Sequence, residues 1–168
     1  MNNTTSMWQT ELWHPLIVHL PVATLLLASV AGLFSYTVSN AEWRKFMRRF
    51  TGALLLIGVV TGWAAIYTGQ LAYNIEVRKI CDPKMLQQHQ WWSYFTIIAY
   101  TVALVLLFLQ ERFGSKSITK VISVFYGLLL MTGLAGLLYA GHLGAEVVYR
   151  QGAGVFKPKN DCSDYIVK

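Results

Sequence analysis

The sequence predicts an all-α fold, a bundle of four helices that each cross a membrane. Of its 168 residues, 55% are hydrophobic and only 13% are charged, a composition typical of membrane proteins. Four segments contain no Asp, Glu, Lys or Arg: residues 12–41, 50–75, 85–110 and 121–145. Each is longer than the roughly 20 residues that a helix needs to cross a bilayer, and none keeps a charged face as a soluble helix would.

The whole chain, 1–168, is predicted to form a single membrane domain. We expect helices at about 12–40, 50–75, 89–110 and 119–149, followed by an outer C-terminal tail at 150–168. The first helix should stay attached, because it is too long for a signal-peptide core and no basic residues precede it. We find no internal sequence repeat.

The positions of the basic residues predict that both termini lie on the outer, periplasmic side. The N-terminal tail carries no Lys or Arg, and basic residues gather in two short links between helices, where they mark the cytoplasmic side. These residues are Arg44, Lys45, Arg48 and Arg49 in the first link, and Arg112, Lys116 and Lys120 in the third. The total numbers of Lys and Arg on the two sides are equal, so the absence of basic residues from the N-terminal tail decides the predicted orientation. The net charge of +6 therefore needs no nucleic acid partner.

All four histidines fall at the outer ends of the predicted helices: His14, His19, His89 and His142. Counting about 20 residues from the inner boundaries puts three of them at nearly the same depth, with His14 about 7.5 Å further out. Ionisable residues at a membrane edge are costly and tend to face the bundle interior, so they indicate a functional site.

Imidazoles from different helices are typical ligands of haem iron, and a b-type haem is predicted because the chain has no CxxCH motif. His14 and His19 point about 140° apart on one helix, so they are not opposite ligands of one iron. The first-choice axial pair is His19 with His142, matched in depth; Pro21 is expected to bend the helix there. His14 and His89 are a second pair or substitutes, which allows one or two haems.

Two other interpretations remain open. Glu146 follows His142 by one helical turn, which would suit a bare zinc or copper site. Alternatively, the glycine-rich helices and the lack of a complete catalytic set indicate an accessory or structural subunit of a membrane complex. The haem interpretation predicts an electron-transfer subunit rather than a stand-alone enzyme. Its partners would be the lipid bilayer, a redox protein or membrane complex on the outer side, and a quinol.

Two segments resemble the bacterial four-helix membrane family called domain of unknown function 2231. They are "HPLIVHLPVATLLLA" near the N-terminus and "GHLGAEVVYRQGAGV" at the end of the last helix. The matching positions are His14, Pro15, Val18, His19 and Pro21, and Gly141, His142, Gly144, Val148 and Tyr149. The resemblance runs from about Leu12 to Val155, with Ala145 where the pattern often has a glycine. It implies a multi-pass protein of the bacterial inner membrane, similar in architecture to small haem-b cytochromes.

Cys81 and Cys162 are the only cysteines, and the predicted topology puts both on the outer side, where a disulfide can persist. We predict that they form a disulfide, the alternative being two unrelated thiols. Intact-mass analysis after alkylation should show two added thiol adducts only if the protein is first reduced. Two adducts without reduction would contradict the bond.

Overall fold

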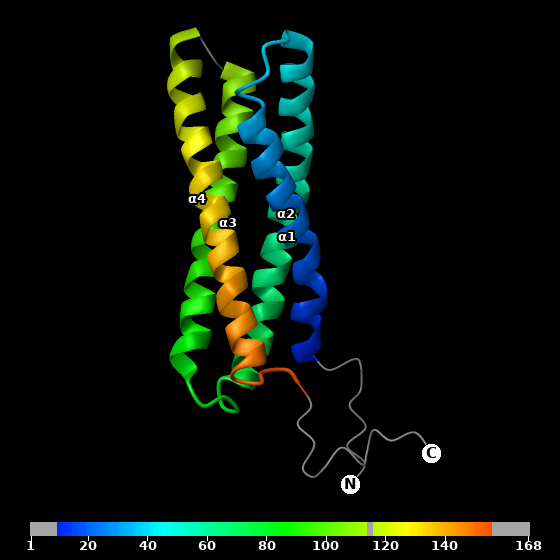
Figure 1. Ribbon diagram of the computed structural model, residues 1–168, viewed down its shortest axis with the longest axis vertical. Helices are drawn as coiled ribbons and strands as arrows, with labels where there is room; N and C mark the ends of the chain where they lie inside the picture. The colour runs from blue at the N-terminus through cyan, green and yellow to red at the C-terminus, as the bar shows by residue number, and fades with distance from the viewer. Residues whose placement is uncertain (1–9, 114–115, 156–168) are drawn as a thin grey trace, which may run out of the picture.

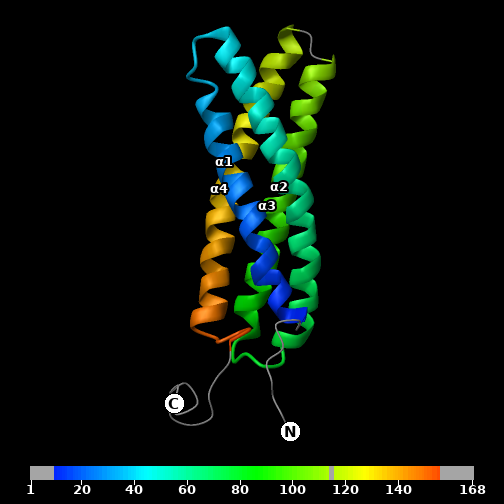
Figure 2. The same cartoon turned by 90° about the vertical axis from the view of Figure 1, so that its right-hand side faces the viewer.

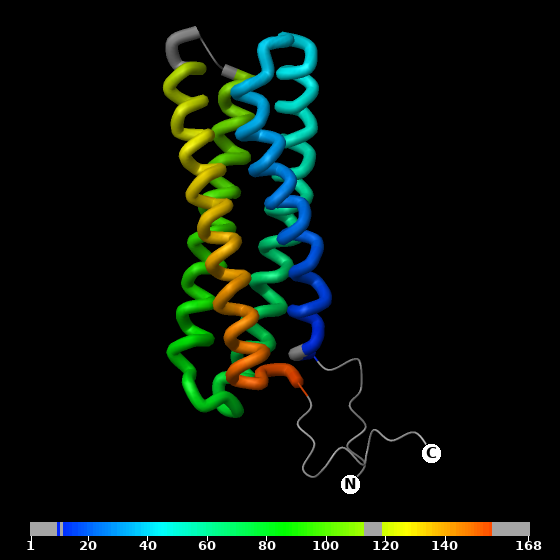
Figure 3. The backbone as a smooth tube through the Cα atoms, viewed as in Figure 1, coloured from blue at the N-terminus to red at the C-terminus, as the bar shows by residue number. Residues whose placement is uncertain are grey.

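The computed structural model describes residues 10–113 and 116–155, and these form four long helices that run side by side (Figure 1). After a single 3-10 turn at Thr10–Leu12, the helices are α1 (Trp13–Phe34), α2 (Ala41–Glu76), α3 (Pro83–Phe113) and α4 (Lys116–Tyr149). All four are long and apolar enough to span a membrane. The turned view in Figure 2 and the backbone trace in Figure 3 show one elongated bundle. The start of α1, the α2–α3 link and the end of α4 share one end of it.

The helices begin and end at different residues from those that hydropathy predicts. The first ends at Phe34 rather than near 40, and the second begins at Ala41 rather than 50. The Asn40 side chain explains the early start, because its oxygen accepts the backbone N–H groups of Glu42 and Trp43 at 2.9 and 3.1 Å. The basic residues assigned to the first link therefore lie within α2. Hydropathy marks where a chain crosses a bilayer, and a helix with polar ends continues beyond it.

The bundle consists of two helical hairpins, because α1 packs mainly along α2 and α3 mainly along α4. Leu25, Leu55, Tyr100 and Leu130 are almost completely buried where the hairpins meet. Among the described residues, two polar contacts join the hairpins at this level: the Tyr100 hydroxyl lies 2.7 Å from that of Ser29, and Trp63 Nε1 donates to Thr101 Oγ1 at 3.2 Å. The core is thus mostly apolar and held by close packing.

The second hairpin repeats the first at a spacing of 75 residues. Three pairs of identical buried residues show it: Ala28 and Ala103, Leu55 and Leu130, and Gly58 and Gly133. Sequence analysis missed this repeat because Ala, Leu and Gly are common throughout membrane helices. In the structure these pairs occupy corresponding places, since α1 and α3 run in one direction and α2 and α4 in the other. Corresponding positions that carry different residues therefore indicate where the two hairpins have different structural or functional roles.

Gly133 lets α4 approach the Tyr100 ring, since a Cβ there would lie 3.0 Å from Tyr100 Cζ. We predict that Gly133→Val lowers the thermal unfolding midpoint in detergent and costs about 1–3 kcal/mol through overpacking. Ala135→Val on the exposed face of the same helix is the matched control and should stay within about 0.5 kcal/mol of the parent. Equal midpoints for the two variants would contradict this packing.

Candidate functional site

The structure brings His14 of α1 and His89 of α3 together at the end of the bundle where α1 begins. Their ring centroids are 6.2 Å apart and the ring planes are inclined by 74°. Both side chains are partly buried. Each comes from a different hairpin, so this T-shaped ring contact crosses the boundary between the two halves.

Each imidazole is fixed by a hydrogen bond to a helix backbone. His14 Nδ1 lies 3.0 Å from the carbonyl oxygen of Ala65 on α2, and His89 Nδ1 lies 2.9 Å from that of Ala140 on α4. A carbonyl oxygen only accepts, so Nδ1 must carry the proton and donate it in both rings. The lone pair of each neutral ring is then on Nε2, the atom that is free to bind a metal.

A glycine beside each ring makes this close approach possible. A Cβ at Gly69 would lie 3.0 Å from His14 Cε1, and one at Gly144 would lie 3.1 Å from His89 Cε1. A larger residue at either position would push the imidazole away from the carbonyl to which it donates.

The two halves of this arrangement correspond through the internal repeat. The histidine, the residue whose carbonyl accepts its hydrogen bond, and the glycine are each separated by 75 residues from their counterparts, at positions 14 and 89, 65 and 140, and 69 and 144. The same local structure is therefore built twice and meets at the junction of the hairpins. The repetition thus puts an equivalent imidazole on each side of that junction.

A cavity of about 420 Å³ adjoins the two imidazoles, with residues of all four helices in its wall. Its size is within the range of roughly 300–1,000 Å³ that small-molecule sites have. Most of the wall is aliphatic or aromatic, and the histidines among its residues are His14, His19 and His89. The site thus combines a large apolar surface with two imidazoles whose Nε2 atoms carry the lone pairs.

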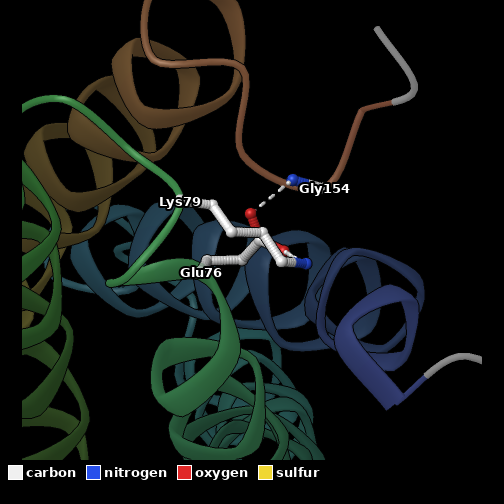
Figure 4. Close-up of polar contacts among 3 residues, drawn as sticks. All are labelled: Glu76, Lys79 and Gly154. Carbon is white, nitrogen blue, oxygen red and sulfur yellow. Dashed lines mark hydrogen bonds and ion pairs between the residues drawn. The ribbon is translucent and has the colours of Figure 1, made fainter.

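The chain that follows α4 contributes to the wall of this cavity. Residues 150–155, here called the closing turn, change direction at Gly152 and Gly154, which both have a φ of 67°. Ala153 and Gly154 line the cavity. The buried Glu76 holds the turn in place, accepting the Gly154 N–H at 3.1 Å and the Lys79 ammonium at 2.9 Å (Figure 4). This first part of the predicted irregular tail is therefore ordered and belongs to the site.

His19 and His142, the pair preferred on depth, are not brought together in this way. His142 is two-thirds exposed, with Nε2 3.8 Å from a Glu146 carboxylate oxygen, and it is not among the residues that line the cavity. His19 is exposed at the cavity wall. Depth along a helix says nothing of rotation about it: His142 is two residues, or about 200° around the helix, from Gly144, which contacts His89.

Two other sequence predictions stay predictions. Cys81 is exposed in the α2–α3 link, but Cys162 lies outside the described residues, so the disulfide is untested. Which end of the bundle faces outward also rests on the distribution of basic residues alone.

The fold and the site together define a membrane-spanning four-helix protein that has, at one end, a cavity beside the paired imidazoles of His14 and His89. The chain belongs to the family described as predicted membrane protein DUF2231, which matches residues 12–157. The description gives no activity. No curated protein and no solved structure matches the chain.

The closing turn depends on Glu76, and we predict that Glu76→Ala frees it. The substitution removes the hydrogen bond between the Glu76 carboxylate and the Gly154 N–H, and a hydrogen bond to a charged group is worth roughly 1.5–3 kcal/mol. Trypsin should then cleave after Arg150 at least about ten times faster than in the parent, as followed by mass spectrometry. Glu111→Ala, on an exposed site at the other end of the bundle, should leave the rate unchanged. An unchanged rate in the Glu76 variant would show that other contacts hold the turn.

Proposed function

We propose that His14 and His89 are the axial ligands of one haem b and that the protein transfers electrons at the outer face of a bacterial inner membrane. The observation that carries this proposal is the pair of facing imidazoles, each anchored through Nδ1. Haem-binding histidines need this tautomer, because the ligating Nε2 must be unprotonated and the ring must be held in one orientation.

The separation of the rings supports the proposal. A metal–imidazole bond is about 2 Å long, and a ring centre lies roughly 1 Å behind its ligating nitrogen. Two imidazoles on opposite sides of one metal therefore have ring centres about 6 Å apart. The ring centroids of His14 and His89 are 6.2 Å apart. They come from opposite hairpins, so a flat macrocycle bound by both would be held between the two halves of the bundle.

The number of protein ligands favours haem over a bare metal ion. A zinc site generally takes three or four protein ligands, and in the described part of the chain no group of three or more His, Cys, Asp or Glu side chains could hold a metal ion. Iron in haem needs only two, because the porphyrin supplies the other four nitrogens. The aliphatic and aromatic wall of the cavity suits the porphyrin surface.

Bound haem would supply a one-electron iron couple, and the protein would determine its potential through ligands, burial and nearby charge. His14 and His89 would both hold the haem iron, which would suit electron transfer rather than the binding of oxygen. The apolar wall would keep water from the macrocycle. The cavity is at one end of the bundle, so a redox protein or membrane complex could exchange electrons across a short distance with a haem bound there.

We predict that the protein purified from haem-replete cells has a Soret band that shifts on reduction with dithionite. His14→Ala and His89→Ala should each lower the haem content of the purified protein at least fivefold, as measured by pyridine haemochrome. His142→Ala is the matched control, because this histidine is exposed and does not line the cavity.

The control variant should keep the parent's haem content and absorption spectrum. Loss of haem in His142→Ala with retention in His14→Ala would favour the pairing based on depth over the one proposed here. A colourless, iron-free parent protein would contradict the haem proposal itself, and elemental analysis would then report any zinc or copper.

A further inference from the structure

The cavity reaches two seams between the hairpins, and the internal repeat allows them to be compared position by position. One seam lies between α2 and α3 and the other between α1 and α4, and residues of both line the cavity. A twofold relation that exchanges the hairpins also exchanges these seams. Without a difference in side chains, the two would be equally open.

The seam between α2 and α3 is closed. Gln90 Nε2 donates to Gln70 Oε1 at 2.6 Å, which joins the two helices beside the cavity. Ile66 and Tyr94 add bulky side chains to the same wall. This side of the cavity is therefore both filled and bridged.

The seam between α1 and α4 has small residues or a proline at the corresponding positions. At a spacing of 75 residues, Ala145 stands where Gln70 does, Pro15 where Gln90 does, and Gly141 where Ile66 does. Neither the alanine nor the proline side chain can form the bridging hydrogen bond. A Cβ at Gly141 would meet no atom within 4 Å. Open space therefore adjoins the cavity on this side.

His19 stands at this open seam, in the position that Tyr94 holds at the closed one. Its side chain is exposed about 9 Å along the helix from the start of α1. An imidazole on a lipid-facing part of a membrane helix is energetically costly, and ionisable residues at such positions generally have a function. The aqueous end of the cavity is lined by the closing turn and by Glu76, so the seam is a separate route of entry.

We propose that a quinol enters the cavity from the bilayer between α1 and α4 and that His19 accepts a proton from one of its hydroxyl groups. This inference rests on the proposed haem function. Oxidation of one quinol to the quinone breaks two O–H bonds and releases two protons and two electrons. Because the protein would hold one haem, it would take the two electrons one at a time, and its redox partner would accept the first before the second arrives. His19 takes one proton and passes it to water, and the second proton goes to water at the outer end of the cavity.

The kinetic test uses the haem-loaded protein in phosphatidylcholine nanodiscs, mixed without oxygen with decylubiquinol. Haem reduction is followed by stopped-flow absorbance. His19→Phe, which removes the proton acceptor, and Ala145→Leu, which fills the seam, should each slow reduction by quinol at least tenfold. His142→Phe and Ala135→Leu, which alter exposed residues outside the cavity wall, should match the parent. All variants should keep their haem and be fully reduced by dithionite.

A binding measurement tests the route without redox activity. An azido-quinone activated by light in the same nanodiscs should label peptides of α1 or α4 that line the seam. Ala145→Leu should remove this labelling in protein with or without haem. Parent rates of haem reduction by quinol in both seam variants, or labelling only of α2 and α3, would overturn the inference while leaving the haem proposal intact. Absence of haem from the parent would instead overturn the proposed function, and labelling would still report on the seam.

Discussion

The site depends on the two hydrogen bonds by which His14 and His89 donate to helix carbonyl oxygens. An imidazole N–H without a partner is expensive in an apolar surrounding, so each ring must find an acceptor within the bundle. The carbonyls of Ala65 and Ala140 supply it, and the adjacent glycines let the rings come close enough. These bonds decide the tautomer, direct both Nε2 atoms away from the backbone and set the distance between the rings. The proposed chemistry follows from that one constraint.

The repeat of the hairpins explains how the two halves can build a symmetric site that is nevertheless accessible from only one side. The histidine, its acceptor and its glycine are kept in both halves, whereas the seams differ. Gln70 and Gln90 bridge one seam, and Ala145 and Pro15 leave the other unbridged. A ligand between the imidazoles would be held equally by both hairpins, while a second reactant could reach it from only one side.

Much of the fold could be predicted from the sequence, because the absence of charge over four long segments leaves few alternatives to membrane helices. Helix boundaries were less predictable, since the cap at Asn40 and the charged start of α2 give no hydropathy signal. That the histidines lie at one end of the bundle could also be predicted from their positions along the helices. Their pairing could not, because residue counts give depth along a helix but not rotation about it. The spacing of Gly69 and Gly144 relative to His14 and His89 carried that signal, hidden among many other glycines.

The central claim is that one iron lies between His14 and His89, and electron paramagnetic resonance of the oxidised, purified protein tests it most directly. The 74° inclination of the two rings predicts a low-spin ferric signal of large anisotropy, as crossed imidazole planes produce. Labelling the histidine nitrogens with ¹⁵N should reveal hyperfine coupling to two imidazoles. A high-spin five-coordinate signal, coupling to a single imidazole, or no iron signal at all would contradict the account.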